Sequence, residues 1–187
     1  MDSLQLDRIC RALLKNAFVG VFAENELKSL RQFERPCGLI VNTEPTPDPG
    51  LHWTAIYLHV DNTGEFFDSF ALDPDEPVKR FLGIHAPRGY TCNTRAVQSL
   101  LTTTCGGFCI VYLDGRRRRP EDSMYVLLQR LFPHRDTWTN DLQVDRFLRE
   151  RFGLNLPLID HQLVIKSISR FYGGRHRPTV FRPKGKG

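Results

Sequence analysis

The hydrophobic positions at the start of the chain recur at roughly helical spacing. Leu4, Leu13 and Phe18 can share one face of a helix, and Gly20 is a typical residue to end it. The first thirty residues are therefore interpreted as a helix that stops at Gly20. Residues 38–41 follow as a short apolar run with branched side chains, which predicts a buried strand before a proline-containing loop.

Two segments rich in aromatic and branched residues flank a short polar turn. Residues 52–60 and 65–70 have the composition of strands, and Asp-Asn-Thr-Gly at 61–64 is typical of a turn, so we predict a β-hairpin. Residues 71–90 contain three prolines and are expected to form a loop with one helical turn. Residues 94–101 are a candidate strand.

A buried helix is predicted at residues 105–113. The run Cys-Gly-Gly-Phe-Cys-Ile-Val-Tyr-Leu is apolar on every face, so a helix here must be buried on every face. Three more helices are predicted from apolar spacing and from Pro120 and Gly153 at their ends, over residues 121–131, 140–152 and 157–172.

The composition is that of one ordinary globular domain. With 187 residues, 41% hydrophobic and 25% charged, the chain can bury a substantial core. No repeat or linker divides it, so we expect one domain over residues 1–172 and a flexible basic tail over residues 173–187. No apolar run is long enough to span a bilayer, and the first residues are acidic where a signal peptide would be basic, which predicts an intracellular protein.

Cysteine usage favours a reducing compartment. The five cysteines are odd in number, contain no C-x-x-C pair and are too sparse for a disulfide scaffold. No two pairs of His or Cys have the short spacing of a zinc site. We therefore expect neither a metal nor an organic cofactor.

Charge is distributed unevenly along the chain. Residues 1–115 carry 10 Lys and Arg against 14 Asp and Glu, whereas residues 116–187 carry 16 against 7. A basic second half is typical of proteins that bind a polyanion, most often nucleic acid. The candidate DNA contacts are the consecutive residues Arg116, Arg117, Arg118 and Arg119. The alternative is a solvated basic face with no ligand.

Cys105 opens the helix predicted to lie at the centre of the fold. A thiol at a helix N-terminus meets the positive end of the helix dipole and unpaired N–H groups, which favour the thiolate. Gly106 and Gly107 leave the backbone accessible, so the N–H of Cys105 can point at a developing oxyanion. The local sequence fits a buried structural cysteine equally well.

Three other polar residues favour the catalytic interpretation. His52 precedes a strand, just after a Pro/Gly loop, and a cysteine nucleophile needs such a base. Asp68 lies on the partner strand, where a carboxylate can fix the imidazole tautomer. Gln98, seven residues before Cys105, offers an amide N–H to an oxyanion.

These residues resemble the adenovirus-type cysteine endopeptidases, the adenain family, over roughly residues 18–113. Phe-Val-Gly at 18–20 is similar to the family's early Phe-x-Gly. Ile-Val-Asn-Thr at 40–43, eight further residues and His-Trp at 52–53 reproduce the family's Val-Asn-Thr to His-Trp segment without a gap. Gln98, six intervening residues and Cys-Gly-Gly-Phe-Cys at 105–109 reproduce its oxyanion glutamine and nucleophile helix.

The resemblance implies a thiol-dependent endopeptidase with an α+β, papain-related fold. Such a fold has a central mixed sheet packed against the buried nucleophile helix, with further helices toward the C-terminus. By the same resemblance, Cys105 is the nucleophile, His52 the general base, Asp68 the orienting acid and Gln98 the oxyanion donor. Cys109, one turn along the helix, is interpreted as a core residue.

The acidic residue departs from the family pattern. Adenain-type enzymes usually have Glu, whereas Asp68-Ser69 resembles the ubiquitin-like-protein proteases. A tight turn centred on residues 62–63 would place Asp68 opposite Tyr57 and Asp73 opposite His52. Either the strands are bulged or twisted, or Asp73 is the partner of His52. We keep Asp68 as the predicted partner of His52 because of the motif resemblance.

The resemblance also implies a biological setting. Adenain-like enzymes mature capsid and core precursors at Gly-Gly-type sites, and DNA and a short basic peptide activate them in the virion and the host nucleus. The peptide is held by a disulfide, for which Cys92 is only loosely placed here, and Gly173-Gly174 resembles a self-cleavage site. The alternatives are a ubiquitin-like-protein protease and, in a different class, a DNA-packaging protein, which would leave His52 and Cys105 unexplained.

Overall fold

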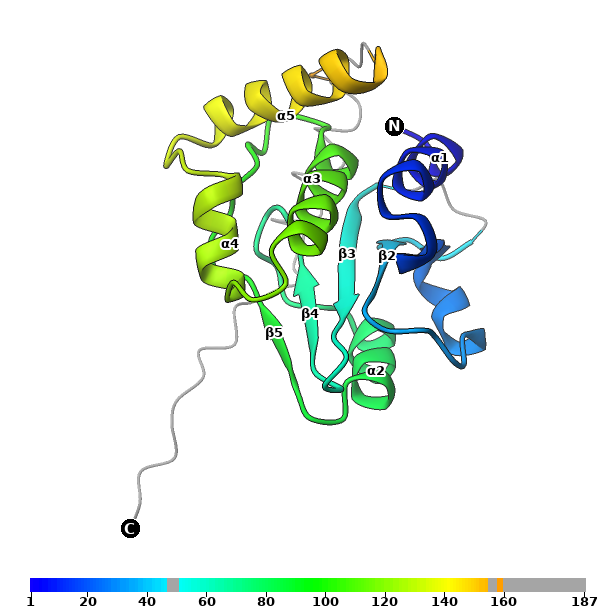
Figure 1. Cartoon of the computed structure of the whole chain (residues 1–187). Helices are drawn as coiled ribbons and strands as arrows, with labels where there is room; N and C mark the ends of the chain where they lie inside the picture. Colours follow the sequence, from blue (N-terminus) through cyan, green and yellow to red (C-terminus); the bar gives the residue numbers. More distant parts are fainter. Residues whose placement is uncertain (47–50, 155–157, 160–187) are drawn as a thin grey trace.

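The computed structural model describes residues 1–46, 51–154 and 158–159. They form a sheet with helices on both faces (Figure 1). The strands are β1 (Phe18–Ala23), β2 (Cys37–Asn42), β3 (Trp53–Leu58), β4 (Gly64–Phe67) and β5 (Tyr90–Cys92). The helices are α1 (Ser3–Leu14), α2 (Glu76–His85), α3 (Cys105–Arg118), α4 (Met124–Leu131) and α5 (Thr137–Phe152), with 3₁₀ turns η1 (Lys15–Ala17) and η2 (Glu24–Ser29).

The five strands follow one another across the sheet in sequence order. The outer pairs, β1 with β2 and β4 with β5, are parallel, and the inner pairs are antiparallel. The sheet is therefore mixed. Because it packs against the buried helix α3, the α+β class expected from the sequence is confirmed.

Helix α3 lies between one face of the sheet and the helices α1, α4 and α5, in the larger of two hydrophobic cores. Its glycines allow close approach on the outer side. A Cβ atom at Gly107 would lie 2.7 Å from Val144 Cγ1 of α5, and one at Gly115 would lie 2.6 Å from Leu131 Cδ1 of α4. The opposite face of the sheet packs against α2 and η2 in the second core. The predicted burial of α3 on every side is confirmed.

The first thirty residues are not a single helix. Helix α1 ends at Leu14, and strand β1 follows where the helix was expected to continue. Gly20, interpreted as a helix stop, lies inside the strand at φ 155°, where the register of β1 against β2 shifts. Aromatic and branched residues around it favour an extended chain, and pairing with β2 outweighs the helical spacing.

The hairpin of β3 and β4 is confirmed, but its register differs from the predicted one. The N–H of His59 donates to the carbonyl of Thr63 at 2.9 Å, and Asn62 adopts the left-handed region at φ 65°. The loop therefore holds three residues between paired positions. Ala55 pairs with Phe67, so the next position places Asp68 beside Thr54 and not beside Tyr57.

Two predictions between residues 71 and 101 were wrong. Helix α2 is ten residues long, where one helical turn was expected. Residues 94–101 contain no strand, and β5 precedes them. Side chains satisfy this loop: Asn140 Nδ2 donates to the Val97 carbonyl at 3.1 Å, and the Ser99 N–H donates to Asp141 Oδ2 at 2.9 Å. These side chains of α5 satisfy backbone groups of the loop that a neighbouring strand would otherwise satisfy.

The later helices α4 and α5 are confirmed with shifted starts. Ser123 caps α4 and Asp136 caps α5, so α4 begins after the predicted Glu121 and α5 before the predicted Asn140. Gly153 ends α5 in the left-handed region at φ 64°, as predicted. The helix predicted over 157–172 and the tail over 173–187 lie outside the described residues, apart from 158–159. Within the described part, no helix has the length and apolar character needed to cross a membrane.

Candidate active site

The fold brings His52, Asp68 and Cys105 to one end of the sheet. His52 immediately precedes β3, Asp68 immediately follows β4, and Cys105 is the first residue of α3. Because β3 and β4 are antiparallel, the start of one lies beside the end of the other, and Figure 1 shows α3 beginning above them. The residues that the sequence singled out are therefore neighbours in space.

His52 and Asp68 form a buried hydrogen-bonded pair. Nε2 of His52 lies 3.0 Å from Oδ1 of Asp68, and both residues are more than nine-tenths buried. The same carboxylate oxygen accepts the N–H of Phe70 at 2.7 Å. Asn93 clamps the backbone of Asp68, accepting its N–H at 2.9 Å and donating to its carbonyl at 2.7 Å. The carboxylate is thus fixed in place before any ligand binds.

Asp73, the alternative partner, does not contact His52. It is exposed in the segment before α2, whereas Asp68 meets the ring directly. The three-residue loop of the hairpin accounts for this outcome. It shifts β4 so that Asp68 lies two residues along the sheet from the position opposite His52, on the same face.

The ring of His52 leaves its second nitrogen, Nδ1, without a hydrogen bond among the described residues. The ring stacks on Phe70, with 4.8 Å between centroids and 28° between planes. The Cys105 thiol is near enough to this ring to raise the pKa of His52. Hydrogen bonds in catalytic sites are commonly long or misaligned until substrate binds.

The electrostatics of the pair favour a thiolate and an imidazolium. Burial lowers the pKa of His52, but the charge and hydrogen bond of Asp68 outweigh it and raise the pKa to about 10. Burial raises the pKa of Cys105, but the hydrogen bond and charge of His52 outweigh it, so the pKa lies below the ordinary value. Each partner therefore stabilises the charged form of the other.

The other four thiols have the opposite electrostatics. Burial raises the pKa of Cys10 to about 12 and the pKa values of Cys37 and Cys92 to about 11. Burial also raises the pKa of Cys109 well above its usual range. All five cysteines are free thiols. Cys105 is thus the thiol whose surroundings favour ionisation.

Gln98 is buried close to the start of α3 and is already hydrogen bonded at both ends. Its Oε1 accepts the hydroxyl of Ser69 at 2.6 Å, and its Nε2 lies 3.1 Å from the carbonyl and 3.2 Å from the hydroxyl of Thr102. An amide nitrogen carries two hydrogens, so an oxyanion can receive one only where Thr102 shares or releases it. The oxyanion role of Gln98 stays a prediction.

We expect Gln98→Ala to lower kcat by about 10²–10³ with little change in KM, because an oxyanion donor acts mainly in the transition state. Steady-state kinetics on a peptide substrate measure both constants. A change confined to KM would place Gln98 in substrate binding. If Gln98→Ala left kcat unchanged and lowered the unfolding midpoint, Gln98 would have only a structural role, through its hydrogen bonds to the loop before Cys105.

A buried polar cluster under this loop was not predicted from the sequence. Asp141 of α5 is fully buried, and its Oδ1 accepts the hydroxyls of Thr102 at 2.7 Å and Thr104 at 2.5 Å. Burial raises the pKa of Asp141. The cluster ties the residues just before Cys105 to α5. Its members are separated widely in sequence, so no local spacing could have revealed it.

The arginine run is only partly exposed, and Arg116 is not a DNA contact. Arg116 is fully buried, with Nη2 2.8 Å from Glu65 Oε1, because the helix carries it into the core one turn beyond Tyr112. Arg117, Arg118 and Arg119 are exposed. No group of His, Cys, Asp or Glu in the part that the structure describes could hold a metal ion.

No protein-family model matches this chain, and no curated protein matches it in sequence. Two crystal structures of the ASFV protease, one of the selenomethionine protein, each align with a TM-score of 0.51 at 18% and 16% identity. The alignments cover 68% and 74% of this chain but 61% and 65% of the ASFV chain, so this chain spans less than two-thirds of that protein. A crystal structure of a de-sumoylating protease aligns over 92% of this chain and 83% of its own, at 13% identity and a TM-score of 0.49.

The likeness to the ASFV protease is one of fold, since identity is low. The expected papain-related architecture, with a mixed sheet against a buried central helix, is thereby confirmed. Similarity to adenain in particular stays a prediction. The chain accordingly shares its fold with the ASFV protease, and it holds His52, Asp68 and Cys105 together at the start of its central helix.

Proposed function

We propose that this protein is a thiol protease in which Cys105 is the nucleophile and His52 the general base. The observation that carries the proposal is the His52–Asp68 pair at 3.0 Å, set against a buried cysteine whose pKa the same histidine lowers. A structural cysteine needs none of these features. Asp68 orients the ring and stabilises its protonated form.

The reaction follows from this geometry. The Cys105 sulfur attacks the substrate carbonyl carbon, and the proton that the thiol gave to His52 passes to the leaving amine. A thioester remains on Cys105, and water activated by His52 hydrolyses it to a carboxylic acid and the free thiol. The first backbone N–H groups of α3 have no partner within the helix and are the proposed oxyanion donors, with Gln98 as the proposed side-chain donor.

The finer proposal is that the enzyme matures capsid or core precursors of a DNA virus or virus-like element. The adenain-like spacing from Asn42 to His52 and from Gln98 to Cys105 supports it, together with the fold shared with the ASFV protease. The second candidate is a ubiquitin-like-protein protease, which Asp68-Ser69 favours over the viral pattern. Incubation with precursor polyproteins and with modifier conjugates separates the two.

DNA remains the proposed polyanionic partner of the basic second half, now without Arg116. Arg117 and Arg118 each pair with Asp114, at 3.3 and 2.6 Å, and remain exposed alongside Arg119. Asp114 itself is buried, whereas the two guanidinium groups are exposed and can contact phosphate from the solvent side. If DNA activates the enzyme, these arginines would contact its phosphates without preference for a particular DNA sequence.

The protease proposal predicts selective alkylation of Cys105. At neutral pH, a thiol with a pKa of about 11 is ionised to only about 10⁻⁴, so iodoacetamide should modify Cys105 well before Cys92, which is partly exposed. Peptide mapping by mass spectrometry gives the rate at each thiol. Cys105→Ala should lower peptide hydrolysis by about 10⁴-fold or more while leaving the fold intact.

His52→Ala provides the control for this assignment. It removes the base and the charge that lower the pKa of Cys105, so the alkylation rate of Cys105 should fall toward that of the other thiols. Equal labelling of Cys37, Cys92 and Cys105 in the unmodified protein would reject the proposal.

A further inference from the structure

A cavity of about 700 Å³ lies beside Trp53, the residue that follows His52. Trp53 forms one wall and also reaches the nucleophile helix: a Cβ atom at Gly106 would lie 3.4 Å from Trp53 Cδ1. On the neighbouring strand, Asn42 pairs with Trp53, and the N–H of Thr43 donates to the carbonyl of His52 at 3.0 Å. The cavity therefore begins one residue from His52.

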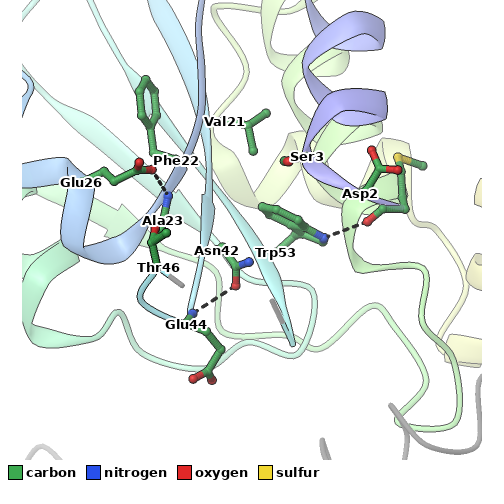
Figure 2. A pocket seen from close by; sticks show the side chains of 11 residues that line it. Asp2, Ser3, Val21, Phe22, Ala23, Glu26, Asn42, Glu44, Thr46 and Trp53 are labelled. Atoms are coloured by element: carbon green, nitrogen blue, oxygen red, sulfur yellow. Dashed lines mark hydrogen bonds between the residues drawn. The ribbon is translucent and has the colours of Figure 1, made fainter. Parts of the chain in front are cut away.

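Asn42 presents an unused hydrogen-bond donor to this cavity. Its residue is nine-tenths buried, and its Oδ1 accepts the N–H of Glu44 at 3.0 Å, which fixes the orientation of the amide. Its Nδ2 atom makes no hydrogen bond among the described residues. Figure 2 shows this nitrogen on the side of Asn42 that faces Trp53. This nitrogen is not one of the fully buried unpartnered atoms, so the cavity gives access to it, and an accessible amide donor can bind a ligand carbonyl.

The charged side chains of the lining are acidic, and Met1, whose α-amino charge also acts on Cys105, lines the cavity beside them. Asp2, Glu26 and Glu44 stand around the cavity, and the described residues that line it include no Lys, Arg or His side chain. The carboxylates are spread over different sides of it in Figure 2, and none of the acidic groups described could enclose a metal ion. Separate carboxylates around an aromatic wall suit a long organic cation, whose methylene stem packs on Trp53.

We propose that this cavity is a substrate subsite that selects a lysine or arginine side chain next to the scissile peptide bond. The inference rests on the proposed protease function and adds the substrate class. Asn42 Nδ2 donates to a substrate backbone carbonyl, and the carboxylates of Glu26 and Glu44 attract the cation. Glu26 keeps its present bond from the N–H of Ala23, because a carboxylate accepts more than one donor.

The test compares short fluorescent peptides that carry a single lysine or its uncharged isostere norleucine at successive positions around Gly-Gly. Their binding to Cys105→Ala protein is measured by fluorescence anisotropy, so that cleavage does not interfere. At one position, lysine should tighten binding by about tenfold, the size of a charge-assisted hydrogen bond. In the unmodified enzyme, kcat/KM should rise with lysine at the same position.

Two variants assign the effect to the cavity. Glu26→Gln with Glu44→Gln keeps the acceptors but removes both charges, and should reduce the lysine preference to less than about twofold. Glu121→Gln, an exposed carboxylate outside the cavity, should leave it unchanged. Asn42→Asp retains an acceptor for the N–H of Glu44 but loses the donor, so it should weaken binding of the norleucine peptide.

The outcomes separate this inference from the protease assignment. Equal binding of lysine and norleucine peptides at every position would overturn the subsite, while selective alkylation of Cys105 would leave the protease assignment standing. Tighter binding of the lysine peptide without a rise in kcat/KM would mean that the lysine does not bind beside the scissile bond during the reaction. That result would also overturn the proposed subsite. If the protein binds lysine peptides selectively but Cys105 is alkylated no faster than its other thiols, the protease assignment is rejected and the binding site is not.

Discussion

Asp68→Asn is expected to lower kcat/KM by about 10²–10⁴ and to narrow its pH profile from both sides. The active ion pair exists above the pKa of Cys105 and is lost as pH rises through the pKa of His52, which lies at about 10. Without the carboxylate, burial dominates and the pKa of His52 falls, so the alkaline limb moves to lower pH. The thiolate then loses its cationic partner, so the acidic limb moves to higher pH.

The measurement is kcat/KM against pH, with the rate of Cys105 alkylation as a second readout that needs no substrate. Asn can still accept the N–H of Phe70 that Asp68 Oδ1 now accepts, so the local fold should persist. Asp73→Asn is the matched control, because Asp73 is exposed and was the alternative partner by strand register. A profile narrowed by Asp73→Asn and not by Asp68→Asn would reverse the assignment.

The sequence was most informative where chemistry and local pattern coincided. The apolar run after Cys105 predicted a helix buried on all sides, because no exposed helix has that composition, and the structure confirms it. The aromatic segments around residues 61–64 predicted the hairpin. The proximity of His52, Asp68 and Cys105 followed from motif spacing that had to be compatible with one fold.

The register of that hairpin could not be predicted in the same way. A single residue, Asn62, in the left-handed region converts a tight turn into a three-residue loop, and this small change decides which of Asp68 and Asp73 reaches His52. The motif favoured Asp68 against the naive register. Turn geometry depends on a few dihedral angles that residue composition constrains weakly, so the motif was the better guide.

Long-range polar contacts were beyond sequence reasoning for a different reason. Asp141 and Asn140 reach the loop before Cys105 from α5, and nothing in their own helix marks them as different from exposed residues. Arg116 had one overlooked signal. It lies four residues after Tyr112, on the same face of a buried helix, so its burial could have been inferred from helical geometry.

Arg116→Met should destabilise the protein by about 3–5 kcal/mol, because it leaves the carboxylate of Glu65 buried with only the His59 ring, 3.5 Å away, as a basic partner. Arg116 is fully buried, donates from Nη2 to Glu65 at 2.8 Å and donates from Nη1 to the Asp122 carbonyl at 2.6 Å. Glu65 also accepts the hydroxyl of Tyr112, whose pKa burial and this carboxylate raise, so the phenol stays a donor. The ion pair thus joins β4 to the end of α3.

Urea unfolding of Arg116→Met, Arg117→Met and the double variant Arg116→Met with Glu65→Gln measures this contribution. Arg117 is exposed on the same helix, and its partner Asp114 keeps Arg118 at 2.6 Å, so its replacement should change the unfolding free energy by less than about 0.5 kcal/mol. The double variant should recover part of the loss, since no unpaired charge remains buried. If Arg116→Met were as stable as Arg117→Met and instead weakened DNA binding, Arg116 would belong to the basic surface and the buried ion pair would not hold the central helix.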